Sequence, residues 1–139
     1  MLNINTELAT AYLAALQPLG VPVFYNFVTP DLVPSDYILF RSIQNIDTST
    51  KSTSELKTTV TVEIRTTSPN VVNTTNLDTL ADGVLTAIYD NTHFNLSLSS
   101  FQIVSTEVAS DNTLNYSLQD GNMYLDRIIT FRHHIFVES

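Results

Sequence analysis

Two segments of the chain place their apolar residues at the spacing of one helical face. The first follows Asn5 or Thr6, either of which suits the N-cap, and Pro18 to Gly20 end it. Its apolar stripe consists of Leu8, Tyr12, Ala15, Leu16 and Leu19. The second segment, Asn76 to Asp90, has the i, i+3, i+4, i+7 spacing, with Leu77, Leu80, Ala81, Val84, Leu85 and Ile88. Gly83 inside it costs about 1 kcal/mol of helix propensity, so we expect close packing at that point.

Six other segments carry the pattern of β-strands. The clearest is Leu56 to Thr66, in which apolar residues alternate with polar ones, so one side should be buried and the other wet or in contact with a partner. The remaining strands are predicted at Val21 to Phe27 (an edge strand), Tyr37 to Ile43, Phe94 to Leu98, Phe101 to Val108 and Tyr124 to Val137. Three polar segments between them predict loops or hairpin tips: Thr29 to Ser35, Gln44 to Ser54 and Ser110 to Asn122.

The order of these elements is α-β-β-β-α-β-β-β. It predicts an α+β fold, with a largely antiparallel sheet, two main helices packed on it and long projecting hairpins. The 139 residues match the size of one domain, so residues 1–139 are expected to form a single unit around one core.

The last predicted strand, Tyr124 to Val137, is long for a domain of this size. At about 3.3 Å per residue it spans roughly 46 Å, whereas a domain of this length is about 37 Å across. In a round domain, a straight strand of this length cannot lie entirely inside the molecule. Either a bulge bends it, or one end projects and offers an unpaired edge to a neighbour.

Composition removes several classes of chemistry. The chain has no cysteine, which excludes disulfides, thiolate metal sites and cysteine nucleophiles. The N-terminal residues lack a basic region and a long apolar run, so no signal peptide is expected, and no segment is long enough for a membrane span. Residence in the cytosol is the default expectation. The net charge of −8 repels phosphate backbones, which argues against a basic nucleic-acid site and favours either a solubilising surface or an acidic wall along which a polyanion slides.

The search for catalytic, cofactor or metal residues finds no specific site. His133 and His134 are adjacent on a strand and should point to opposite faces, so they cannot grip one metal, and His93 is the only other histidine. The three glycines are isolated, which excludes the familiar phosphate loops. The carboxylate pairs, Asp31 with Asp36 and Asp111 with Asp120, are predicted in loops, where solvation explains them.

Two polar residues of the last strand share the parity of its apolar residues. Arg127 and His133 lie in step with Leu125, Ile129 and Phe131, and polar groups on a core face need partners. Either these positions lie at the ends of the core or outside it, or Arg127 forms an ion pair with an acidic residue of a neighbouring subunit. For His133 a structural role is the favoured interpretation. Arg41, Arg65 and Arg132 are expected at the surface, with interface contact as the alternative.

With this order of elements the chain resembles the tail terminator, or tail completion, proteins of long-tailed bacteriophages. The resemblance covers most of the chain and rests on order and texture, without an invariant signature. It is carried by the early helix through Leu16, Val23-Phe24-Tyr25, the Pro-rich loop before Tyr37-Ile38-Leu39-Phe40, the Thr-rich strand Thr58 to Ile64, the helix Leu77 to Ile88 and Arg127-Ile128-Ile129-Thr130-Phe131-Arg132.

The resemblance implies a non-enzymatic virion structural protein at the neck, made in the host cytoplasm. Proteins of this family form a hexameric ring on the head-proximal end of the tail tube, end tube polymerisation and serve head-tail joining during viral assembly. The implied partners are further copies of the chain, the tail tube protein, the head-closure or connector protein, and a sheath protein if the tail is contractile. DNA would pass through an acidic lumen without specific binding.

The family has no catalytic residues to transfer, so the candidates for contact are regions: Gln44 to Ser54, Ser110 to Asn122 and the ends of the long strands. The alternative within structural proteins is a neighbouring neck component, such as a head-closure or connector protein. From another class, a small enzyme or ligand-binding domain would have to use His93, His133 and His134 as its polar centre.

Overall fold

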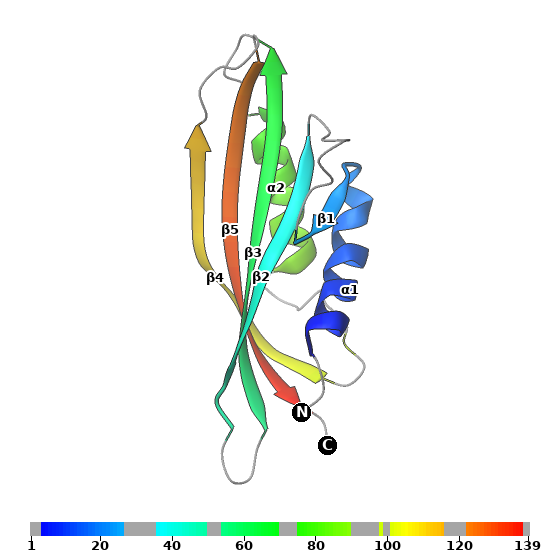
Figure 1. Cartoon of the computed structure of the whole chain (residues 1–139), viewed down its shortest axis with the longest axis vertical. Helices are drawn as coiled ribbons and strands as arrows, with labels where there is room; N and C mark the ends of the chain where they lie inside the picture. The colour runs from blue at the N-terminus through cyan, green and yellow to red at the C-terminus, as the bar shows by residue number, and fades with distance from the viewer. Residues whose placement is uncertain are drawn as a thin grey trace.

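The structure, a computed structural model, describes residues 4–26, 36–49, 54–69, 75–89, 98, 101–115 and 122–137. Two α-helices and five strands make up the described fold (Figure 1). Their bounds are α1 Ile4–Leu16, followed by the 3₁₀ turn η1 Gln17–Leu19, then β1 Val23–Tyr25, β2 Tyr37–Asp47, β3 Glu55–Pro69, α2 Thr75–Ile88, β4 Phe101–Asn115 and β5 Asn122–Val137.

The strands form one sheet in the order β1-β2-β3-β5-β4, in which only β1 and β2 run parallel. Both helices lie against the same side of this sheet (Figure 1). The predicted fold class is therefore confirmed: an α+β fold with a largely antiparallel sheet and two helices packed on it. The predicted strand Phe94 to Leu98 falls outside the described residues, except for Leu98, which packs against the core.

Helix α1 is amphipathic as expected, but it begins earlier than the sequence suggested. Leu8, Tyr12 and Leu16 are fully buried. Gly20 is the C-cap of η1 and has a φ of 83°, a left-handed conformation that glycine adopts at no steric cost. The helix starts at Ile4, so Asn5 and Thr6 lie inside it and neither is the N-cap. Asn5 instead uses its side-chain oxygen to accept a hydrogen bond of 2.6 Å from Asn45 of β2.

Helix α2 buries Leu77, Ala81, Val84 and Ile88 against the sheet. The close packing predicted at Gly83 is present, because a Cβ added there would lie 2.7 Å from Cδ2 of Leu19. The last residues of η1 therefore pack directly on the α2 backbone. Neither described helix is long and apolar enough to cross a membrane.

Two predictions of loops are partly wrong. Gln44–Asp47 extends β2 and Ser110–Asn115 extends β4, and both segments pair in register with their neighbours, β3 and β5. Most of their residues are polar, and residues 44–47 and 110–113 lie exposed near the ends of their strands. Their local composition therefore resembles that of a loop, although cross-strand pairing makes them part of the sheet. Residues 50–53 and 116–121, which belong to the two predicted loops, lie outside the described residues.

The long last strand is accommodated in a way that the sequence argument did not foresee. β5 pairs with β3 along nearly its whole length without a register shift, and from Leu125 to Val137 it also pairs with β4, so only its first three residues are without a described partner strand on the second side. The register shifts lie in other strands instead: one in β2 between Arg41 and Gln44, and two in β4, the neighbour of β5, at Ile103/Ser105 and Val108/Ser110. The assumption of a round domain was wrong, because the molecule is drawn out along its strands (Figure 1).

Candidate functional site

The two sides of the sheet differ in what covers them. The side toward the helices, here called the inner face, carries fully buried residues on β3 and β5: Leu56, Val60, Val62, Ile64, Leu125, Ile129, Phe131 and Ile135. The opposite side, the outer face, carries on β3 the alternating residues Glu55, Lys57, Thr59, Thr61, Glu63 and Arg65. Within the described part of the chain no helix and no second sheet lies over the outer face (Figure 1). It is therefore the surface on which a partner can act.

Near the end of β3 the outer face carries a tightly held arginine. Arg65 donates two hydrogen bonds to Asp126, from Nε to Oδ1 at 2.8 Å and from Nη2 to Oδ2 at 2.9 Å. Its guanidinium also lies 5.8 Å from the ring centroids of both Tyr37 and Tyr124. The two hydrogen bonds and the flanking rings hold the guanidinium of Arg65 in place. Its positive charge is therefore paired with an acid of the same chain.

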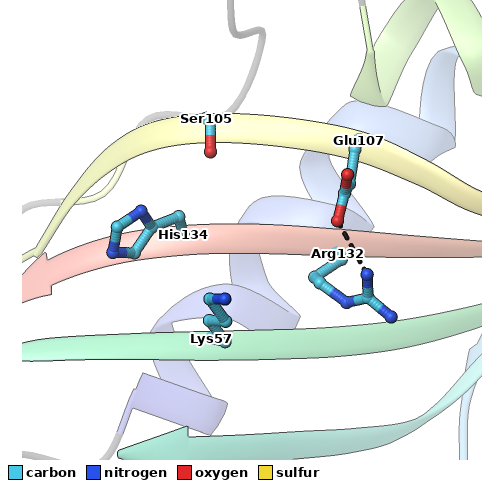
Figure 2. Close-up of a pocket in the computed structure, with 5 residues that line it drawn as sticks. All are labelled: Lys57, Ser105, Glu107, Arg132 and His134. Atoms are coloured by element: carbon cyan, nitrogen blue, oxygen red, sulfur yellow. Dashed lines mark hydrogen bonds and ion pairs between the residues drawn. The ribbon is translucent and has the colours of Figure 1, made fainter. Parts of the chain in front are cut away.

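The other half of the outer face contains a shallow hollow of about 200 Å³. Its lining comes from three adjacent strands, namely Lys57 of β3, Arg132 and His134 of β5, and Ser105 and Glu107 of β4 (Figure 2). Arg132 bonds Glu107 at 2.8 Å, and His134 lies 3.1 Å from Glu55. Lys57 has no ion pair or hydrogen bond to any described residue and is exposed. The hollow therefore offers one unpaired cation beside paired ones.

Arg127 lies on the inner face, where its partners belong to the same chain. It donates to both carboxylate oxygens of Asp111, at 2.8 and 2.6 Å, and to Asp78 of α2 at 3.3 Å. The Arg127 guanidinium lowers the pKa of Asp111, and the hydrogen bond to Asp111 raises the pKa of Arg127. The ion pair to a neighbouring subunit considered from the sequence is therefore not needed, because β4 and α2 supply the acids. Asp111 itself lies in β4 and not in a loop.

His133 belongs to the core, and the idea that it lies at the end of the core or outside it is wrong. It is fully buried, with Nε2 2.5 Å from the Tyr12 hydroxyl and Nδ1 2.9 Å from the Thr106 hydroxyl. Burial lowers the pKa of His133 to about 4 and raises the pKa of Tyr12 well above its usual value. A neutral imidazole has one donor and one acceptor nitrogen, which the two hydroxyls satisfy. His133 thus ties α1 to β5 and β4 as a structural residue.

The remaining candidates do not assemble into a reactive centre. His133 and His134 point to opposite faces, as predicted, and His93, Asp31 and Asp120 lie outside the described residues. Asp36 accepts a hydrogen bond of 3.0 Å from the backbone of Thr67. Among the residues that the structure describes, no group of three or more His, Asp or Glu side chains is placed to hold a metal ion. Sequence reasoning missed Tyr12 and Thr106 as partners of His133, because the contacts join distant segments.

Charge is distributed unevenly between the two layers. All four arginines form ion pairs, with Glu63, Asp126, Asp78, Asp111 and Glu107 as their partners. Neither described helix contains a lysine or arginine, whereas both contain acids: Glu7 in α1, and Asp78 and Asp82 in α2. The helix layer is therefore acidic, and the outer face carries the unpaired lysine.

Comparisons with known proteins add one finding about the fold. The chain matches no known protein-family model, and no curated protein resembles it in sequence. Among solved structures it is similar to a chain of the virion of a native gene transfer agent particle, with a TM-score of 0.69 and 16% sequence identity. The similarity covers 96% of this chain and 99% of the other. At this identity the likeness shows a shared fold, which extends over both chains from end to end.

Proposed function

We propose that this protein is a structural virion protein that caps the head-proximal end of a phage tail tube as a homohexameric ring. The cap ends tube polymerisation and joins the tail to the head connector. The observation that carries this proposal is the fold shared, over nearly the full length of both chains, with a component of a gene transfer agent virion. The order and texture of the sequence, which resemble tail terminators, support it independently.

The distribution of side chains supports a role in assembly and not in catalysis. The buried polar residues His133 and Asp126 are engaged in contacts within the chain, and one whole side of the sheet is left uncovered by the described residues. A two-layer domain with an open sheet face is suited to contact with neighbours. The net charge of −8 suits a passage in which DNA moves without binding to the wall.

The partners of such a ring are the tail tube protein on one side and the head-closure or connector protein on the other, with a sheath protein added in contractile tails. The candidate contact regions are the segments Gln44 to Ser54 and Ser110 to Asn122 and the ends of the long strands. Within these regions Ile46 is 62% exposed, the largest exposed fraction among the large apolar residues that the structure describes.

The test is a tube-length assay. Purified tail tube protein is polymerised with and without this protein, and tube lengths and tube ends are recorded by negative-stain electron microscopy. We expect shorter tubes with extra ring-shaped density at one end only. Tubes of unchanged length without end density, even at excess protein, would remove the capping function.

A neighbouring neck component remains the second candidate, because the matched chain is described only as part of a virion. Gold labelling of the protein in intact particles separates the two roles. Label at the junction of tube and connector supports the terminator, and label on the connector itself supports a head-closure protein.

A further inference from the structure

Among the residues that the structure describes, the outer face and helix α2 each present an exposed charge that forms no ion pair. On the outer face it is Lys57, which has no partner among the described residues. On the helix side it is Asp82 of α2, which is exposed and makes no hydrogen bond or ion pair with the described residues, although it lies in the field of Arg127. The two charges are of opposite sign and lie on opposite sides of the molecule.

The surroundings of Lys57 form a continuous row across four strands. Ile46 of β2 pairs with Lys57 of β3, Lys57 with His134 of β5, and His134 with Ser105 of β4. The row combines the 62% exposed side chain of Ile46 with an unpaired ammonium group and a half-buried imidazole. Figure 2 shows Lys57, His134 and Ser105 on the same face of the sheet, beside the Arg132–Glu107 pair. An apolar anchor next to a cation suits an acidic partner surface.

The surroundings of Asp82 have the complementary character. Asp78, one helical turn earlier, still exposes 58% of its side chain despite its contact with Arg127. No lysine or arginine lies on α2 or on α1 to offset these acids. The exposed side of α2 therefore presents an acidic stripe that a cationic surface can recognise.

We propose that the row around Lys57 on the outer face of one copy binds the acidic side of α2, around Asp82, on the next copy. This inference rests on the proposed ring and names the two surfaces that build it. A second copy is the fitting occupant because both halves of the contact are present on this one chain. A contact between two different surfaces repeats from copy to copy and closes into a ring when the rotation allows.

The alternative of a two-fold contact through the outer face is disfavoured by charge. Centred on this row, such a contact would bring Lys57 of one copy toward Lys57 of the other, and like charges in an interface cost several kcal/mol. With a net charge of −8 the copies repel one another in general, so a contact that brings the unpaired cation onto an acid is favoured.

The test is a charge-reversal cycle. Assembly of wild type, Lys57→Glu, Asp82→Lys and the double variant is followed by mass photometry, in the presence of tube protein, over a concentration series. We expect each single reversal to weaken assembly by about 100-fold and the double variant to recover to within about tenfold of wild type. Raising the salt concentration should weaken wild-type assembly, because the contact is screened.

The matched control is Thr10→Lys, which places the same cation on the exposed side of α1, away from the proposed contact. It should assemble as wild type. If wild type forms rings but the single reversals do as well, or the double variant is no better than either single one, the ring uses other surfaces and this inference fails while the capping function stands. If wild type forms no rings even with tube protein, the ring and this contact fall together.

Discussion

The inner and outer faces of the sheet are built from the same strands, but one is buried against the helices and the other is exposed and charged. On β5, Phe131 and His133 point inward and are fully buried, whereas Arg132 and His134 point outward and remain 47% and 32% exposed. The inner face holds its buried imidazole with specific partners from other elements, in the contact of His133 with Tyr12 and Thr106. The outer face holds most of its charges in cross-strand pairs and leaves Lys57 unpaired. The inner face thus forms the core, and the outer face is left open for the assembly contacts that we propose.

The largest effect should come from truncating an aromatic ring on the inner face. Phe131→Ala removes a fully buried ring, and we expect the free energy of unfolding to fall by about 3 to 5 kcal/mol. The matched control is Phe136→Ala on the outer face of the same strand, which should cost about 1 kcal/mol because that ring is only partly buried. Chemical denaturation measures both. Equal losses would remove the distinction between the two faces.

The two adjacent histidines should differ in how they link stability to pH. The pKa of His133 is about 4 in the folded chain and near 6.5 when unfolded, so the unfolded chain binds the proton first as the pH falls. The stability held above pH 6.5 is therefore lost between pH 6.5 and 4, by about 3 kcal/mol in total. His133→Gln should lack this loss, whereas His134→Gln should keep it. Denaturation at a series of pH values tests this, and an unchanged pH profile in His133→Gln would contradict the buried, neutral state.

An ion pair of the outer face should contribute measurably to the free energy of unfolding only where it is bidentate and partly buried. Arg65→Ala leaves the nearly buried Asp126 without its bidentate partner, and we expect a loss of about 2 kcal/mol. Asp126→Asn, which keeps a polar group that accepts from Arg65, should cost less. Thermal unfolding of both variants provides the measurement, and a neutral Arg65→Ala would show that this pair is not held as described.

The smallest effect is expected at the exposed pair in the hollow. Arg132 and Glu107 are 47% and 60% exposed, so Arg132→Ala should change the free energy of unfolding by less than about 1 kcal/mol. Any larger effect on assembly than on folding would assign this residue to the contact surface. A loss of folding stability as large as that of Arg65→Ala would instead make the whole outer face structural.

The strands and helices could be predicted wherever one side of an element is buried. Leu56 to Thr66 alternates cleanly because its inner side meets the core, and the stripe from Leu77 to Ile88 follows from the same cause in a helix. Gln44–Asp47 and Ser110–Asn115 were missed because residues 44–47 and 110–113 are exposed, and an exposed strand carries no apolar alternation. Their strand character comes from pairing with distant residues, which local composition does not encode.

The candidate surface was less predictable than the fold. The sequence shows that Lys57 lies on the polar side of its strand, but not that Arg41, Arg65, Arg127 and Arg132 are each taken up by an acid of the same chain. Those ion pairs depend on the order of the strands in the sheet, in which β5 lies between β3 and β4. Once that order is known, Lys57 stands out among the described Lys and Arg residues as the one without an ion pair.

The most direct test of the outer face as the assembly surface uses the absence of cysteine from the chain. Ile46→Cys introduces a single thiol on the outer face, and Thr10→Cys introduces one on α1 as the control. The rate of maleimide labelling is measured for dilute protein alone and for protein assembled on tail tubes. We predict that assembly slows labelling of Ile46→Cys at least tenfold and leaves Thr10→Cys unchanged, since about tenfold protection needs only about 1.4 kcal/mol of contact energy at the site. Equal labelling of Ile46→Cys in both states would contradict the assignment of the outer face to assembly.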